Sequence, residues 1–208
     1  MLPESLTGVP WATRDGDVIT SMVPLFGDGA GNSGTSLHDS ARTALCQGDR
    51  LVGEAPEITG QFTVGPENAR YRLTVEATRP AAFDVSSKVS AAWTFDSANT
   101  PEREALPLSA VRFTPELDGA STAPAGTHQE VPVFLQPQGG APAPPARISV
   151  QVSYDEGATW VEAPVIDNSR VALDHPADAT SVSLRAGATD AQGNTVDQTI
   201  IRAYKLKR

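Results

Sequence analysis

Apolar and polar residues alternate with a period of two along much of this chain, which is the pattern of β-strands with one buried face. The alternation is clearest over residues 71–77, 88–95 and 181–188. No segment of useful length carries apolar residues at the 3.6-residue period of a helix. The pattern therefore predicts an all-β protein, with about six strands in the first hundred residues and about seven in the second hundred.

A polar segment, 97–106, separates the two sets of strands. Each set has the size of an immunoglobulin-like or fibronectin type III-like sandwich, which holds about seven strands in about 100 residues. We therefore expect two tandem antiparallel β-sandwich domains, residues 1–104 and 105–208, that meet at this segment. In the last strand, 196–204, the alternation breaks at Ile200-Ile201, which predicts a bulge or burial on both faces.

One turn carries a recognisable motif. The residues Ser153-Tyr154-Asp155-Glu156-Gly157-Ala158-Thr159-Trp160 have the form S-x-D-x-G-x-T-W and follow an alternating run. In a β-hairpin, Asp155 can accept hydrogen bonds from turn amides, Gly157 can adopt a positive φ, and Trp160 can cover the corner. The form resembles the Asp-box hairpin of sialidases and other secreted β-proteins, which implies a structural role for Ser153, Asp155, Gly157 and Trp160. A propeller needs several such blades, and the chain has a single copy of the motif.

The overall charge narrows the class of partner. The chain has 208 residues, with 16 basic and 25 acidic side chains, a net charge of −9 and a pI of about 4.7. Nucleic acids and anionic membranes bind basic patches, so the composition argues against both as partners. The high counts of Gly and Pro, 17 each, agree with many turns between short strands.

The location of the protein has two interpretations. Cys46 is the single cysteine, so no internal disulfide can form. No apolar run approaches the roughly 18 residues of a membrane span, and the first residues lack the basic start and apolar core of a signal peptide. The chain is either a cytosolic protein or a piece of a longer secreted chain. We favour the second interpretation and expect an extracellular location.

A short loop resembles the surroundings of a serine nucleophile, because residues 31–38 read Gly-Asn-Ser-Gly-Thr-Ser-Leu-His. In a subtilisin the nucleophile follows Gly-Thr-Ser, precedes Met-Ala and begins a long buried helix. Here Leu37-His38-Asp39 follow, and the chain has neither an Asp-Thr-Gly nor a His-Gly-Thr motif. We therefore expect a loop and propose no triad from Ser36 and His38, and no catalytic residue elsewhere.

The metal-binding signals are weak. His38, His128 and His175 are scattered, so the spacing of a zinc site is missing. The turns at 15–17 and 190–194 are rich in oxygen ligands, and Asp190 and Asn194 are the candidates for calcium. Because such residues commonly cap their own turn, we favour capping and expect no cofactor.

The three tryptophans could form a platform on which sugar rings stack. Trp93 lies in a strongly alternating run and Trp160 closes the hairpin, so we expect both in the core. Trp11 is the one that we expect to be most exposed, and its neighbours show no sugar-binding pattern.

The order of several segments resembles a known family. The chain resembles the C-terminal end of the large secreted subtilisin-like (S8 family) serine peptidases of actinomycetes. The resemblance lies in residues 148–160, 171–176, 182–186, 190–196 and 200–204, and the preceding half looks similar too, at 71–75 and 88–95. The similarity concerns the non-catalytic tail of those enzymes, whose Asp, His and Ser motifs have no counterpart here.

This resemblance implies a non-catalytic accessory region that stabilises the protease or engages its substrate, and whose parent chain is a secreted serine endopeptidase. The implied partner is the protease domain upstream, with protein substrate or cell-surface polysaccharide as a further ligand. Two other hypotheses stay open. The chain is a carbohydrate-binding or cell-surface adhesion module of another exported protein, or a standalone enzyme that uses the loop around Ser33 to His38.

Overall fold

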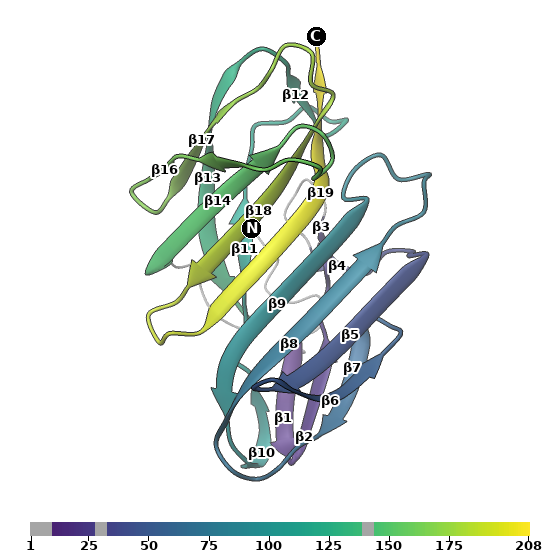
Figure 1. The fold of residues 1–208 in the computed structure, drawn as a ribbon, viewed down its shortest axis with the longest axis vertical. Coiled ribbons are helices and arrows are strands. Elements are labelled where there is room, and N and C mark those ends of the chain that lie inside the picture. Colours follow the sequence, from purple (N-terminus) through teal and green to yellow (C-terminus); the bar gives the residue numbers. More distant parts are fainter. Residues whose placement is uncertain (1–9, 28–32, 139–143) are drawn as a thin grey trace.

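The computed structural model describes residues 10–27, 33–138 and 144–208, and strands but no helices form within these ranges. Figure 1 shows the arrangement of the strands. The prediction of an all-β protein built from antiparallel sheets is therefore confirmed.

The largest sheet has nine strands and extends across the whole molecule (Figure 1). Its strands, in spatial order, are β15 (Val161–Ala163), β14 (Arg147–Ser153), β18 (Ser181–Thr189), β19 (Thr195–Lys207), β9 (Lys88–Ser97), β8 (Ala69–Thr78), β5 (Ser40–Gln47) and β6 (Arg50–Ala55), and β12 (Thr122–Pro124) pairs in parallel with the end of β19.

Three smaller sheets complete the fold. One has the order β10 (Thr100–Ala105), β1 (Ala12–Gly16), β2 (Val18–Met22) and β7 (Thr59–Thr63). Another has the order β11 (Ser109–Phe113), β13 (His128–Pro137), β17 (Arg170–Asp174) and β16 (Val165–Ile166). The strands β3 (Phe26–Gly27) and β4 (Ser33–Gly34) form a two-stranded ribbon.

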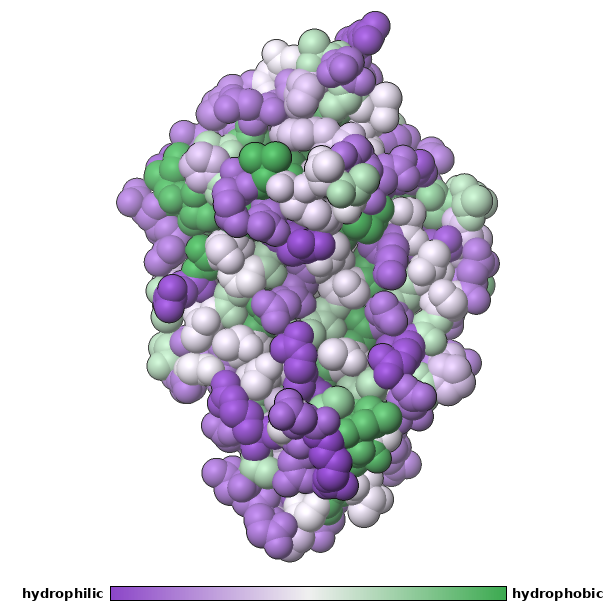
Figure 2. Space-filling view, viewed as in Figure 1, coloured by the Kyte–Doolittle hydropathy of each residue, from purple (hydrophilic) through white to green (hydrophobic). Residues whose placement is uncertain are grey.

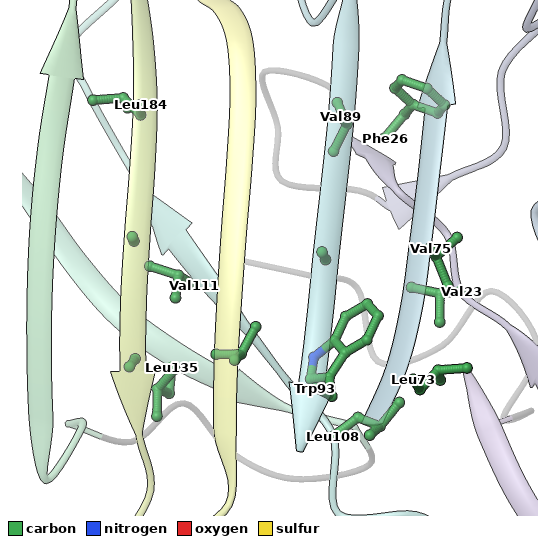
Figure 3. Packing of buried hydrophobic residues seen from close by; sticks show 14 of the residues in the cluster. Val23, Phe26, Leu73, Val75, Val89, Trp93, Leu108, Val111, Leu135 and Leu184 are labelled. Atoms are coloured by element: carbon green, nitrogen blue, oxygen red, sulfur yellow. The ribbon is translucent and has the colours of Figure 1, made fainter. Parts of the chain in front are cut away.

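The alternation of the sequence gives the large sheet one buried and one outward face. On β8 the residues Tyr71, Leu73, Val75 and Ala77 are buried, whereas the residues between them are partly or fully exposed. The buried side chains join one apolar cluster, in which Trp93, Leu73 and Leu108 lie together (Figure 3). The indole Nε1 of Trp93 donates a hydrogen bond of 2.7 Å to the carbonyl oxygen of Ser109.

The first and second halves of the chain meet in a continuous strand pair, which we call the seam. Strand β19 pairs antiparallel with β9 from Thr195 opposite Thr94 to Ile201 opposite Lys88. Beneath the seam, the side chain of Gln198 accepts a bond from the amide of Val111 and donates one to its carbonyl oxygen, at 3.2 and 3.1 Å. The backbone and the core are therefore both continuous between the halves.

The polar segment expected between the domains is partly a strand. Thr100–Ala105 form β10, which pairs with β1 at the edge of a four-stranded sheet. Five of its six residues are exposed, so the apolar alternation that marks a half-buried strand is missing there. The expected boundary at residues 104 and 105 lies at the end of this edge strand.

A bulge interrupts the last strand. The register between β18 and β19 shifts between Val182 and Leu184, and Arg202 on the opposite strand adopts a φ of 55°. Its amide donates a hydrogen bond of 3.0 Å to Oγ of Ser183. The bulge predicted from Ile200-Ile201 is therefore confirmed, centred one or two residues further on.

Candidate functional site

A hollow of about 630 Å³ lies on the outward face of the nine-stranded sheet. Hydrophilic side chains gather over β14, β18, β19, β9 and β8 on the face that Figure 2 shows. The residues that line the hollow come from both halves of the chain, and we call it the seam groove: Arg42, Arg72, Thr74, Val75, Glu76, Ser90, Ala91, Ala92, Ser149, Gln151, Glu162, Arg185, Ala186, Gly187, Asp197 and Thr199.

Small side chains on the seam make the floor of this groove. Ser90 pairs with Thr199, and Ala92 pairs with Asp197, so the four side chains share the outward face of β9 and β19. On the neighbouring strand, a Cβ at Gly187 would lie 3.3 Å from Oδ1 of Asp197 and 3.4 Å from Oγ of Ser149. The lack of a side chain at Gly187 therefore keeps the floor low.

Long charged side chains of the first half form one wall. The guanidinium of Arg72 lies 3.4 Å from Oδ2 of Asp197 and donates to Oγ1 of Thr94 at 3.3 Å. The guanidinium of Arg42 donates two bonds, of 2.6 and 3.0 Å, to one carboxylate oxygen of Glu54. These pairs hold the donors in place across the strands.

Residues of the second half form the opposite wall. The guanidinium of Arg185 lies 4.2 Å from the centre of the Trp160 ring, which is a cation–π distance, and its Nη1 donates to Oε1 of Gln151 at 3.4 Å. The amide nitrogen of Gln151 in turn donates to Glu162 at 2.8 Å. The hairpin of β14 and β15 thus contributes to the groove through Trp160, which supports the guanidinium of Arg185.

The groove is built for binding by hydrogen bonds. Its lining has three arginines and three carboxylates, so it carries no formal net charge although the chain carries −9. The lining contains no histidine or cysteine that could act as a base or nucleophile. Among the described residues, no group of three or more His, Cys, Asp or Glu side chains could hold a metal ion.

The S-x-D-x-G-x-T-W turn is held by its own polar side chains. Oγ of Ser153 donates to Oδ1 of Asp155 at 2.7 Å and accepts the amide of Gly157 at 2.8 Å. Asp155 also accepts the amide of Thr159 at 2.8 Å and its hydroxyl at 2.6 Å. The bonds from Thr159, followed by the bond from Ser153, lower the pKa of Asp155 to about 2.

The turn requires left-handed backbone at two adjacent positions. Glu156 has a φ of 60° and Gly157 a φ of 88°. A Cβ at Gly157 would lie 2.9 Å from Cδ1 of Ile201 and 3.2 Å from the Trp160 ring. Glu156 is held by an ion pair of 2.5 Å with Arg202, the residue at the bulge of β19.

The other predicted turns bind their own backbone. Oδ1 of Asp190 accepts the amides of Gln192 and Asn194, both at 2.9 Å, and Oδ2 accepts Nδ2 of Asn194 at 2.8 Å. Asp190 and Asn194, the calcium candidates, therefore face each other as a cap. At the turn of residues 15–17, the buried Arg14 donates to the carbonyl oxygen of Gly16 and lies 3.4 Å from Oδ1 of Asp17.

Ser36 and His38 do not form a catalytic pair. Nδ1 of His38 faces the carbonyl oxygen of Ser36 at 3.2 Å, and its Nε2 lies 3.4 Å from Glu57. The imidazole therefore contacts the backbone of Ser36 and not its hydroxyl. Residues 31 and 32 of this loop lie outside the described residues.

The three tryptophans do not share one exposed face. Trp93 is buried, with 2% of its surface exposed. Trp160 is partly buried beneath Arg185, and Trp11 is partly buried against the core. Trp160 is thus less buried than we expected, because it lies between Arg185 and the turn.

Sequence reasoning missed a buried histidine that joins three elements. His175, which is 4% exposed, makes edge-on contacts with the rings of Tyr154 and Tyr204. The Tyr154 hydroxyl donates to the carbonyl oxygen of Asp174 at 2.9 Å. Because its proton is used there, this hydroxyl accepts a bond from Nδ1–H of His175 at 3.1 Å. The other ring nitrogen of His175, Nε2, then accepts a bond from the Tyr204 hydroxyl at 3.3 Å.

This pattern of donors and acceptors fits the neutral imidazole. Burial lowers the pKa of His175, whereas the nearby Asp174 raises it to a smaller extent. Burial also raises the pKa of Tyr154 to about 12. Both tyrosines therefore stay protonated, and at neutral pH His175 is an uncharged link between the end of β14, the end of β17 and β19.

None of the described segments is a helix that could cross a membrane. Comparison with models of known protein families finds no match, and comparison with curated proteins finds no similar sequence.

Proposed function

We propose that this chain is a non-catalytic accessory region of a secreted subtilisin-like serine peptidase and that it binds a ligand in the seam groove. The observation that carries the proposal is a polar hollow of about 630 Å³ whose floor and walls come from both halves of the chain. Its ion pairs and side-chain hydrogen bonds link strands of the sheet, and side chains held in this way lose less entropy on binding.

The proposal includes two tandem sandwiches of the immunoglobulin or fibronectin type III kind, here sharing one sheet. One four-stranded sheet belongs to each half of the chain, and the nine-stranded sheet takes strands from both. A rigid unit of this kind holds the groove residues in a fixed geometry. It also suits an accessory role, because the walls present side chains that can form hydrogen bonds to a ligand.

Retention on solid supports tests the binding role. The purified chain is passed over casein-agarose, cellulose, chitin and peptidoglycan, next to a Ser90→Gln variant whose longer side chain fills the floor. We expect retention on at least one support and a loss of about tenfold in the variant. Retention on none of the supports, or equal retention of both proteins, contradicts the proposal.

A second assay tests the lack of catalysis. The chain is incubated with casein and with a fluorophosphonate that labels active-site serines. We expect neither hydrolysis nor label. Labelling that Ser36→Ala abolishes would instead support the standalone enzyme.

A specific observation favours a second candidate, a carbohydrate-binding or adhesion module of another exported protein. Hydroxyl, carboxylate, amide and guanidinium groups line the groove, and these are the groups that exchange hydrogen bonds with sugar hydroxyls. The open reading frame upstream of residue 1 distinguishes the two contexts. A subtilisin domain there supports the first candidate, and a different domain supports the second.

A further inference from the structure

We infer that the ligand of the seam groove is a single chain of a neutral polysaccharide, an inference that rests on the binding role proposed above. The groove lies between the walls on β8 and β18. Strands β9 and β19 lie between them, and the ion pair of Arg72 with Asp197 reaches across β9 at 3.4 Å.

The charge of the lining selects an uncharged ligand. Arg42, Arg72 and Arg185 are balanced by three carboxylates, and most of these charges have a partner within the sheet. A polyanion would have to overcome the carboxylates and the net charge of −9, and a polycation would meet the arginines. Neutral hydroxyl groups can bond with both kinds of side chain.

The backbone of the floor has no free hydrogen-bonding groups for an extended peptide. Strand β9 pairs with β8 on one side and β19 on the other, and β19 pairs with β18, so the strands beneath the groove cannot add a further strand. The lining also contains no aromatic residue and no methionine, which are enriched in the buried centres of protein interfaces. The groove therefore suits a ligand whose own surface consists of hydroxyl groups.

The same lack of aromatic residues distinguishes among polysaccharides. Flat crystalline surfaces are bound by coplanar exposed rings, whereas Trp93 is buried and Trp11 and Trp160 are partly buried in separate places. A concave polar groove instead surrounds a single soluble chain. Arg72 and Asp197 are the central pair, because they lie side by side over the seam at 3.4 Å and offer a donor fork and an acceptor to the same sugar.

Affinity electrophoresis tests the inference. At pH 8 the acidic chain migrates in a native gel, and a binding polysaccharide cast in the gel retards it. The gels contain galactomannan, arabinoxylan, laminarin, dextran or hydroxyethyl cellulose as neutral chains, polygalacturonate as the anionic chain, or gelatin as the extended protein. We expect retardation by at least one neutral polysaccharide and an affinity that changes less than about twofold between low and high salt.

A matched pair of variants locates the site. Arg72→Ala should weaken the retardation about tenfold, since it removes charged hydrogen bonds. Arg170→Ala is the control, because Arg170 is also half-exposed, at 48% against 46%, and also makes one carboxylate ion pair, but lies on β17 outside the groove. The control should bind as the wild type does.

The outcomes separate this inference from the proposed function. Retardation by gelatin or polygalacturonate alone, with sensitivity to Arg72→Ala, overturns the neutral polysaccharide and leaves a binding module. Retardation by no gel overturns the inference, and if the solid supports also retain nothing, it overturns the binding role as well. Equal loss in both variants shows that the groove is not the site.

Discussion

At the scale of single residues, the S-x-D-x-G-x-T-W turn shows how few side chains determine a hairpin. Asp155 accepts bonds from Ser153 and Thr159, and Gly157 provides a φ of 88° where a side chain would also meet Ile201. Sequence reasoning could foresee the roles of Asp155 and Gly157, because both follow from local turn chemistry. The side chain of Ile201, which leaves no room for a Cβ at position 157, comes from a distant part of the chain and could not be foreseen.

Gly157→Val should destabilise the protein by about 2 kcal/mol or more, because a β-branched residue is strained at positive φ and its side chain meets Ile201 and Trp160. Thermal unfolding followed by circular dichroism measures the change. Gly193→Val is the control, since Gly193 has a similar φ of 85° with no atom within 4 Å of a Cβ. Its smaller cost isolates the strain of the backbone, and an unchanged melting temperature in Gly157→Val would contradict the turn as described.

At the scale of elements, alternation identified the strands that have one buried face and missed those that do not. The runs around Leu73, Trp93 and Leu184 are β8, β9 and β18. Strand β10 was not foreseen, since an exposed edge strand has no buried side. The link through His175 was not foreseen either, because a lone histidine before Pro176 is typical of a turn and its partners come from other strands.

His175 should make stability depend on pH near neutrality. Its pKa in the folded state is lower than the usual value of about 6.5, so between these two values the unfolded state binds more protons. The contribution of neutral His175 to the free energy of unfolding is complete above pH 6.5 and is lost as the pH falls toward the pKa of the folded state. We expect the melting temperature to fall between pH 7.5 and 5, and this fall should diminish in His175→Gln.

The pH series of melting temperatures needs a control variant at another histidine. His128, which is half-exposed and paired with Asp174 at 2.7 Å, provides it. His128→Gln should keep most of the fall that the wild type shows, because burial lowers the pKa of His175 more than the charge of His128 does. If both variants keep the same fall, His175 is not the group that titrates.

At the scale of the whole molecule, the seam is the feature that alternation could not predict. Every strand near it was expected, but the pairing of β9 with β19 joins residues about a hundred positions apart, and alternation carries no information about such partners. The seam groove depends on that pairing, because Ser90 and Thr199 become neighbours only there. The sequence therefore could not predict the groove, although it contains every residue of the floor and walls.

The shared sheet and core predict that both halves unfold in one transition. Gln198→Ala removes both side-chain bonds to Val111 beneath the seam and should cost about 1 to 3 kcal/mol. We expect calorimetry to show a single peak that moves to lower temperature, with hydrogen exchange accelerated in β8 and β18 alike. Two separate peaks, with only one of them moved, would indicate halves that unfold independently and would support a strict division into two domains.

The seam also determines the order of events when the chain folds. Strand β9 is synthesised about a hundred residues before β19, and contacts between such distant residues form slowly because a long loop must close. During that interval β9 presents an unpaired edge with an apolar face, a surface that favours aggregation. Closure of the seam is then the step that protects this edge. A nascent chain thus completes this sheet only when β19 has emerged.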